Sequence, residues 1–426
     1  MAAAYDVAVI GGGVIGCTVL HELTQKGFSC VLCERNSDLV AESSCGSSSI
    51  IHTGYDALPD TSECQFLQTS QQLNQEYYEK FNIPYKRIGA MIVAWNEEEL
   101  KQLPGIVEQA HKNGITSVCQ ISKEQLLEKE PNLSQDALGA VCIPGEGVVD
   151  PWLLPIMMAH TAKQKGAKIL LGCNLLNGSQ DKDGNWLLIT NTGQIKVKAV
   201  VNCAGLHGDT VEKINKQPSF QIFPRKGQYI VYDDKAGSLL NSIILPIATR
   251  KTKGTLLFPS VYGHLVVGPT AEEQPNRDKW PVNSYTSHSL ETYGHKILPE
   301  LSKHSPVAAY AGLRPATQYR DYQLATHTDR KWITIGGIRS TGLSACTGLA
   351  QYVGNQMQSE LGLVPHTTSG SVEIAQQSDE GDDKHGENNN MWNLDDKHQD
   401  HLVLSGAKYR ITHPLSRLGL DPSSKL

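Results

Sequence analysis

The sequence predicts a mixed α/β protein with two intertwined lobes, one built on a parallel sheet and the other on a mostly antiparallel sheet. Three observations predict this fold. A strand, a helix and a second strand follow one another over residues 6–34. Short β segments alternate over residues 220–335. The chain of 426 residues is also too long for one ordinary domain.

The N-terminal unit is the best defined element. Residues 6–10 form an apolar, β-rich run, and residues 14–26 carry apolar side chains at helical spacing up to Gly27, a helix-stop signal. Residues 28–34 follow as a second strand, so this is one βαβ unit with a right-handed crossover. The Ser/Gly-rich loop at 42–49 then interrupts the alternation of strand and helix.

Further elements follow from the same patterns. Helices are predicted at 65–82, 97–113, 150–165, 287–298 and 345–361, and the third of these opens with Asp150 as cap and Pro151 in the first turn. Strands are predicted at 85–94, 168–172, 185–190, 196–203, 228–232, 255–258, 264–267 and 332–335. Residues 366–400 are polar and predict disorder, and the stretch from 401 predicts a hairpin.

Composition excludes several classes of protein. The net charge of -6 argues against nucleic acid as a partner, and residues 378–400 carry eight acids against two lysines. No apolar run reaches the ~20 residues of a transmembrane segment. Ten cysteines at irregular spacing, without a secretory signal, predict reduced thiols. Cys30 and Cys33 lie inside an apolar strand, so we interpret them as core residues and expect no metal site.

A glycine motif marks the turn between the first strand and the first helix. Gly11, Gly13 and Gly16 form the pattern G-x-G-x-x-G, which lets the backbone approach a pyrophosphate at the helix N-terminus. Glu34 ends the next strand, where a carboxylate accepts hydrogen bonds from ribose hydroxyls. The motif therefore predicts a Rossmann-type dinucleotide site, although it does not distinguish NAD from FAD.

Five sequence blocks together carry a family resemblance. They are Gly11-Gly12-Gly13-Val14-Ile15-Gly16, Ser49-Ile50-Ile51-His52-Thr53-Gly54-Tyr55, Pro224-Arg225-Lys226-Gly227-Gln228-Tyr229, Tyr310-Ala311-Gly312-Leu313-Arg314-Pro315 and Gly336-Gly337-Ile338-Arg339-Ser340-Thr341-Gly342-Leu343. Over about residues 5–362, their order and spacing resemble the D-amino-acid oxidase superfamily of flavoproteins. Within it, the chain is most similar to the branch of L-2-hydroxyglutarate oxidases and FAD-dependent glycerol-3-phosphate dehydrogenases.

The resemblance implies FAD as cofactor and a Rossmann-type FAD-binding domain with a second, mostly antiparallel β-sheet substrate domain. The expected FAD-binding segments are 1–84, 151–215 and 326–362; the substrate domain takes 85–150 and 216–325, a disordered acidic linker 363–400, and a hairpin and tail 401–426. The implied cofactor-binding residues are Gly11, Gly13, Val14, Ile15, Gly16, Glu34, Arg35, Ser44, Cys45, Ser47, Ser48, Ser49, Leu175, Cys203, Ala204, Gly205, Gly337, Ile338, Arg339, Ser340, Thr341, Gly342 and Leu343.

Two side chains are the expected catalytic residues. His52 is the candidate base, because a neutral imidazole can accept a hydroxyl proton near physiological pH. By resemblance, Arg314 lies at the substrate end of the flavin, where a guanidinium binds carboxylate or phosphate through two hydrogen bonds. The further candidates for binding the substrate are Arg225, Lys226, Lys253 and Tyr310.

The expected function is transfer of a hydride from a C–H bond of a small anionic hydroxy substrate to flavin. A 2-hydroxy acid such as L-2-hydroxyglutarate and glycerol 3-phosphate remain equal candidates at this point. Dioxygen, giving hydrogen peroxide, is the expected electron acceptor, and another acceptor is the alternative. The alternatives are an amine oxidase of the sarcosine and D-amino-acid type, and a flavin-binding protein without catalytic activity.

The last three residues suggest a location. Ser424-Lys425-Leu426 matches the address read by the peroxisomal import receptor, and a peroxisome tolerates hydrogen peroxide. We expect a peroxisomal protein if the source is eukaryotic and a cytoplasmic one otherwise.

Overall fold

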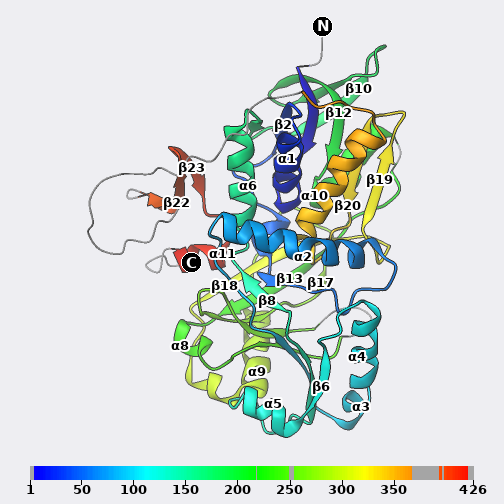
Figure 1. Ribbon diagram of the computed structural model, residues 1–426. Helices are drawn as coiled ribbons and strands as arrows, with labels where there is room; N and C mark the ends of the chain where they lie inside the picture. The colour runs from blue at the N-terminus through cyan, green and yellow to red at the C-terminus, as the bar shows by residue number, and fades with distance from the viewer. Residues whose placement is uncertain (1–3, 217, 249–253, 367–392, 396–397, 421–426) are drawn as a thin grey trace, which may run out of the picture.

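The computed structural model describes residues 4–216, 218–248, 254–366, 393–395 and 398–420. In Figure 1 the chain forms an upper lobe, in which helices cover one face of a sheet, and a lower lobe with a second sheet. The fold is mixed α/β, as predicted. Lys253, the residues 367–392 of the expected linker, and Ser424, Lys425 and Leu426 lie outside the described residues.

The upper lobe contains an eight-stranded sheet in the order β10-β11-β12-β1-β2-β9, with β20 beside β12 and β19 beside β20. Its strands are β1 (Tyr5–Ile10), β2 (Cys30–Cys33), β9 (Lys168–Leu170), β10 (Leu175–Gln180), β11 (Trp186–Thr190), β12 (Gly193–Asn202), β19 (Gln323–His327) and β20 (Trp332–Gly336). The strands β9, β2, β1, β12 and β20 run parallel. Their carboxyl ends therefore share one edge, where doubly wound sheets bind nucleotides.

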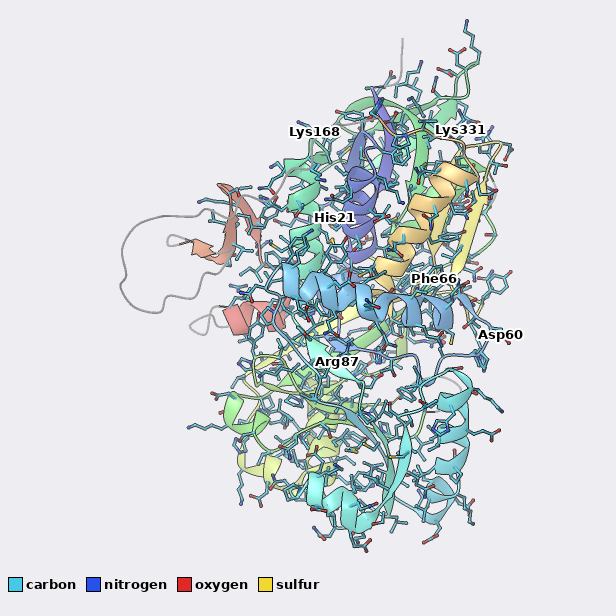
Figure 2. All side chains as sticks on the ribbon, viewed as in Figure 1. His21, Asp60, Phe66, Arg87, Lys168 and Lys331 are labelled. Atoms are coloured by element: carbon cyan, nitrogen blue, oxygen red, sulfur yellow. The ribbon has the colours of Figure 1, made fainter. Side chains whose placement is uncertain are left out.

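Three helices cover one face of this sheet, and a fourth crosses beneath them (Figure 1). The three are α1 (Val14–Gln25), α6 (Leu153–Gln164) and α10 (Gly342–Ser359), and the crossing helix is α2 (Ser62–Lys80). Their apolar faces bury Leu20, Met158 and Leu349 completely. His21 of α1 packs edge-on against Tyr77 of α2, and Figure 2 shows this histidine among the upper helices.

The lower lobe contains a nine-stranded sheet in the order β17-β13-β16-β15-β14-β5-β7-β6, with β18 beside β13. Its strands are β5 (Ala90–Ala94), β6 (Cys119–Ser122), β7 (Gly139–Ile143), β13 (Phe223–Val231), β14 (Ile243–Leu245), β15 (Leu256–Pro259), β16 (Leu265–Gly268), β17 (Glu272–Glu273) and β18 (Ala308–Ala316). The helices are α3 (Glu97–Leu100), α4 (Leu103–Lys112), α5 (Lys123–Lys129), α8 (Asp234–Gly237) and α9 (Ser284–Ile297), while α7 (Gly208–Glu212) belongs to the upper lobe. Every pairing is antiparallel except that of β14 with β5.

A small sheet of β3 (Ile50–Ile51), β8 (Gly147–Val149) and β4 (Tyr85–Lys86) joins the lobes. Ile51 of β3 pairs with Gly147 of β8, so the residue after β3 and the residue before β8 become neighbours. Arg87 follows β4 and donates hydrogen bonds to Gly145 O and to Gln75 of α2. Figure 2 shows Arg87 below α2, at the junction.

Three predicted elements are corrected. The helix expected at 97–113 is two helices, because Pro104 has no N–H to donate to the carbonyl of Leu100. The strand expected at 85–94 divides into β4 and β5, which Gly89 separates with a φ of +72°. Asp150 is not the N-cap of α6, which is Trp152, because the helix begins only at Leu153; the Asp150 carboxylate still accepts from Trp152 N and Leu153 N.

The C-terminal region also differs from the predicted hairpin. Strands β21 (Asn393–Asp395), β22 (His398–Leu404) and β23 (Ala407–Arg410) form a three-stranded sheet, and helix α11 (Pro414–Leu420) follows. Strand pairing therefore begins within residues 363–400, the segment that was expected to be a disordered linker. The first residues of that segment are docked as well, because His366 N donates to Gly27 O and the His366 ring pairs with Asp6 at 2.9 Å.

Candidate active site

A cavity of about 900 Å³ lies along the carboxyl edge of the parallel strands and extends to β13 and β18 of the lower lobe. This volume is near the upper end for ligand pockets, ~300–1,000 Å³. The predicted site residues that line it are Gly11, Gly13, Val14, Ile15, Glu34, Arg35, Ser44, Ser47, Ser48, His52, Leu175, Cys203, Ala204, Gly205, Arg225, Arg314, Gly337, Ile338, Arg339, Ser340, Gly342 and Leu343. Gly16, Cys45, Ser49, Lys226, Tyr310 and Thr341 are not among its lining residues.

The glycine turn is tight for steric reasons. Gly11 has a φ of +105°, and a Cβ there would lie 2.6 Å from Cys203 O. A Cβ on Gly16 would overlap the carbonyl oxygen of Gly11, so Gly16 serves the packing of the turn rather than the cavity wall. The turn thus keeps the backbone of α1's N-terminus open to the cavity, where partial positive charge favours an anion.

Glu34 follows β2 and closes the adjacent part of the cavity. Its Oε2 accepts from Gly12 N at 2.6 Å, and its Oε1 accepts from Asn36 N at 2.8 Å. Burial raises the pKa of this carboxyl, while the hydrogen bonds from Gly12 and Asn36 oppose the rise. Arg35 points to other partners, forming ion pairs with Glu42 and with Asp278.

Residues 39–49, which we call the serine loop, form one wall of the cavity. Ser44 Oγ accepts from Val14 N at 3.0 Å, which ties the loop to the start of α1. A Cβ on Gly46 would overlap the backbone of Gly312, so the loop also lies against β18. Ser49 adopts a left-handed φ of +62°, and Cys45 is half-buried and donates to Ala41 O.

His52 leaves β3 and meets a carboxylate that the sequence did not reveal. Its Nδ1 lies 3.0 Å from Oε2 of Glu146, which is 0 % exposed. Thr53 N and Thr53 Oγ1 donate to the other carboxylate oxygen at 2.6 and 2.8 Å. Because a carboxylate can only accept, Nδ1 carries the proton and Nε2 remains as the acceptor. The only sequence signal for Glu146 is its position between Gly145 and Gly147.

Arg314 lies on β18 opposite Arg225 of β13. Its Nη1 and Nη2 donate to Thr270 O at 3.3 and 3.4 Å, which are long hydrogen bonds. The guanidinium rests over Gly227, where a Cβ would lie 2.6 Å from Nη2. Because Gly227 has no side chain, it leaves room for the guanidinium at the cavity wall.

The other predicted substrate-binding residues divide by strand geometry. Arg225 lines the cavity, and Lys226, one residue further along β13, lies on the opposite face because side chains alternate. Tyr310 is buried, stacks on Tyr229 with ring centroids 4.5 Å apart and donates to Ser47 O. Tyr229, rather than Tyr310, is the tyrosine that lines the cavity.

A family profile described as "FAD dependent oxidoreductase" matches residues 6–356. The chain belongs to this family of FAD-dependent oxidoreductases. The resemblance stated from the five sequence blocks is thereby confirmed, and so are the cofactor and the enzyme class.

The names of several relatives within the family state a hydroxy compound as the substrate. The glycerol 3-phosphate dehydrogenase of Caloramator mitchellensis is 32% identical over 82% of this chain and 73% of its own length. The glycerol 3-phosphate oxidase of Mycoplasma pneumoniae is 31% identical, over 81% of this chain and 92% of its own. L-2-hydroxyglutarate dehydrogenases, such as that of Escherichia coli K12 at 25%, are more distant. The solved FAD-bound L-α-glycerophosphate oxidase of Mycoplasma pneumoniae is similar in structure, with a TM-score of 0.79, 28% identity, and coverage of 85% of this chain and 96% of its own.

The residues of this oxidoreductase fit FAD. The glycine turn and Gly205 offer a backbone cradle for the pyrophosphate, and Glu34 offers carboxylate oxygens to the ribose. Two buried hydroxyls of the serine loop, Ser43 Oγ and Ser49 Oγ, have no hydrogen-bond partner among the residues that the structure describes. Such hydroxyls are expected to find partners, and Ser43 lines the cavity where the cofactor would bind.

The turn before α10 provides the wall expected near the flavin ring. Arg339 and Ser340 line the cavity there, followed by Gly342 and Leu343 of the first helical turn. Thr341 is not a lining residue, but it donates at 2.6 Å to Glu63, which is one. FAD, when bound, accepts a hydride and gathers negative charge as it is reduced, and the N-terminus of α10 favours such charge.

Metal-ligand clusters, disulfides and candidate membrane spans were not found among the described residues. In the part of the chain that the structure describes, no group of three or more His, Cys, Asp or Glu side chains could hold a metal ion. All ten cysteines are free thiols. Among the described helices, none has the length and apolar character needed to cross a bilayer.

Glu34→Ala is expected to weaken FAD retention. The variant loses the ribose acceptor and the hydrogen bond that orders Gly12, and hydrogen bonds to charged groups count about 1.5–3 kcal/mol each, so affinity should fall roughly tenfold to a hundredfold. Titration of the apoprotein with FAD, followed by flavin fluorescence, measures the change. Full flavin occupancy after purification and dilution would contradict the assigned role.

Proposed function

We propose that this enzyme oxidises glycerol 3-phosphate at its secondary hydroxyl and passes the electrons to dioxygen, releasing hydrogen peroxide. The observation that carries the proposal is that a fixed imidazole and a guanidinium line one cavity in a chain whose nearer relatives are named for glycerol 3-phosphate. These relatives are more similar to it than the L-2-hydroxyglutarate dehydrogenases are.

Arg314 is the proposed anchor for the phosphate. A guanidinium presents parallel N–H groups to a phosphate, and its hydrogen bonds to Thr270 O are long, so the N–H groups can turn to a better acceptor. Arg225 lines the same cavity and adds positive charge. An anion held at this end leaves the carbinol carbon further into the cavity, toward the serine loop and His52.

His52 is the proposed base for the hydroxyl proton. Glu146 fixes the proton on Nδ1, so Nε2 is free to accept the proton while the C–H hydrogen leaves as a hydride to FAD. The products are then a ketone and the reduced cofactor, and dioxygen with two protons takes up the electron pair as hydrogen peroxide. Glu146 stabilises the imidazolium formed in this step and is a positioning residue.

A substrate screen tests the proposal. The purified holoenzyme is mixed with glycerol 3-phosphate, L-2-hydroxyglutarate, sarcosine or D-alanine, and peroxide release is measured beside anaerobic bleaching of the flavin absorbance. We expect the highest kcat/KM with glycerol 3-phosphate. A higher kcat/KM with L-2-hydroxyglutarate would show that the proposed substrate is wrong, and a higher value with an amine would show that the proposed reaction class is wrong. If none of these compounds bleaches the flavin, a protein without catalytic activity is favoured. Bleaching of the flavin without release of peroxide would show that dioxygen is not the electron acceptor.

Import into peroxisomes is part of the proposal. It rests on Ser424-Lys425-Leu426, a tripeptide of the type that import receptors read, and on the peroxide that the proposed oxidase would release. Deleting these three residues is expected to leave a fluorescently tagged protein in the cytosol of eukaryotic cells with its oxidase activity intact. Co-localisation with a peroxisomal marker after the deletion would refute the proposed address.

A further inference from the structure

The C-terminal segment, residues 398–420, lies outside the part of the chain that matches the family profile, yet it is firmly packed on the body. Leu402, Leu404 and Ile411 join the core of the upper lobe, and Leu415 joins that of the lower lobe. In Figure 1, β22 and β23 lie beside α6, with α11 below them. The segment therefore bridges the lobes near the cavity.

Two neighbouring residues of this segment hold the serine loop. Thr412 Oγ1 donates to Val40 O at 2.9 Å. His413 Nε2 lies 3.1 Å from Ser47 O, which also accepts from Tyr310. Both contacts are to backbone carbonyls of the loop, so they fix its course independently of its side chains.

The direction of the His413 hydrogen bond follows from its surroundings. Leu415 N donates to Nδ1 at 3.2 Å, so the ring proton is on Nε2 and is donated to Ser47 O. His413 is 0 % exposed, and burial lowers the pKa of its imidazole to about 3. The ring is therefore neutral at physiological pH, as this arrangement requires.

The other side of the loop faces the cofactor. Ser44, Gly46, Ser47 and Ser48 line the cavity, so the loop would separate bound FAD from the C-terminal segment. The same contact continues through rings, because His413 packs on Tyr310 at 5.7 Å, and Tyr310 stacks on the cavity residue Tyr229.

We propose that the C-terminal segment positions the serine loop for FAD, so that docking of this segment and binding of the cofactor stabilise each other. If the segment raises FAD affinity by a given factor, FAD must stabilise the docked segment by the same factor. Thr412 and His413 are positioning residues, since they act on the cofactor through Val40 and Ser47. A segment that only stabilised the fold would lower the melting temperature without a specific effect on FAD.

Paired single-hydroxyl variants of the full-length protein test this. Thr412→Val removes the bond to the serine loop, and Tyr409→Phe removes a comparable bond to His160 of α6, at 3.1 Å, away from that loop. We expect Thr412→Val to weaken FAD binding roughly fivefold to tenfold, the scale of one net hydrogen bond, and to alter the visible circular dichroism of bound flavin. Tyr409→Phe keeps the bond from Thr412 to the serine loop, so it should weaken FAD binding less and leave the circular dichroism of bound flavin unchanged. An equal loss in the two variants, or none in Thr412→Val, would overturn the proposal.

Two further measurements keep the test independent of folding defects. His413→Gln retains an N–H near the position of Nε2 and is expected to bind FAD better than His413→Ala; equal affinities would contradict the proposed donor. In the unaltered protein, hydrogen exchange of residues 398–420 should slow when FAD is added to the apoprotein. Exchange that is the same with and without FAD would sink the proposal, whatever the substrate of the enzyme is.

Discussion

Replacement of Glu146 by glutamine is expected to slow flavin reduction about as much as loss of a general base, ~10²–10⁴-fold. Thr53 N donates to one carboxylate oxygen, so that position must remain an oxygen in the variant. The amide NH₂ must then face His52 Nδ1, which becomes an acceptor and leaves the proton on Nε2. The imidazole is present in the wrong tautomer. Rapid mixing with glycerol 3-phosphate under anaerobic conditions measures the reduction rate.

His52→Asn is the matched comparison. An asparagine NH₂ group can still donate to Glu146, so no buried carboxylate is left unpaired, while the acceptor Nε2 is lost. Both variants should purify with FAD. Because the two residues act as one unit, the double variant should be no slower than either single variant. A normal reduction rate in Glu146→Gln would refute the role assigned to this carboxylate.

Arg314→Ala is expected to lower kcat/KM for glycerol 3-phosphate on the order of 10²–10³-fold, because truncating one partner of a buried charge pair costs about 2–5 kcal/mol. Most of the change should appear as a higher KM, with FAD still bound, since no cofactor contact is assigned to this side chain. Steady-state peroxide release measures both constants. Arg314→Lys should be intermediate, because an ammonium lacks the paired N–H groups.

Gly227→Ala tests the same geometry without removing a charge. The added methyl group would lie within 2.6 Å of Arg314 Nη2 and displace the guanidinium. We expect a raised KM here too. Normal kinetics in both Gly227→Ala and Arg314→Ala would mean that the anion binds elsewhere.

The sequence pattern predicted those parts of the fold that depend on contacts between residues close together in the sequence. The unit β1-α1-β2 and its glycine turn were foreseen because strand, helix and turn signals lie within 34 residues. The sequence blocks also indicated Arg314 and His52 as cavity residues. The break at Pro104 comes from one missing N–H donor, and the start of α6 at Leu153 lies where two N–H groups donate to Asp150; periodicity resolves neither.

What the sequence could not predict depends on distant contacts. Glu146 reaches His52 across 94 positions, through the pairing of β3 with β8. The exclusion of Lys226 from the cavity depends on which face of β13 packs inward, a matter of register. The docking of Thr412 and His413 depends on a surface formed by the serine loop. The polar segment that precedes these residues in the sequence gave no sign of this docking.

The pairing of β1 with β12, and of β12 with β20, has a consequence for biosynthesis. Val7 pairs with Ala199, and Val201 pairs with Ile333. A nascent chain therefore cannot complete the nucleotide crevice until β20 and α10 have left the ribosome, and until then the sheet lacks a strand and one of the helices that cover its apolar face. Capture of the flavin must therefore wait until most of the chain has been synthesised, and the growing polypeptide should depend on chaperones to avoid aggregation.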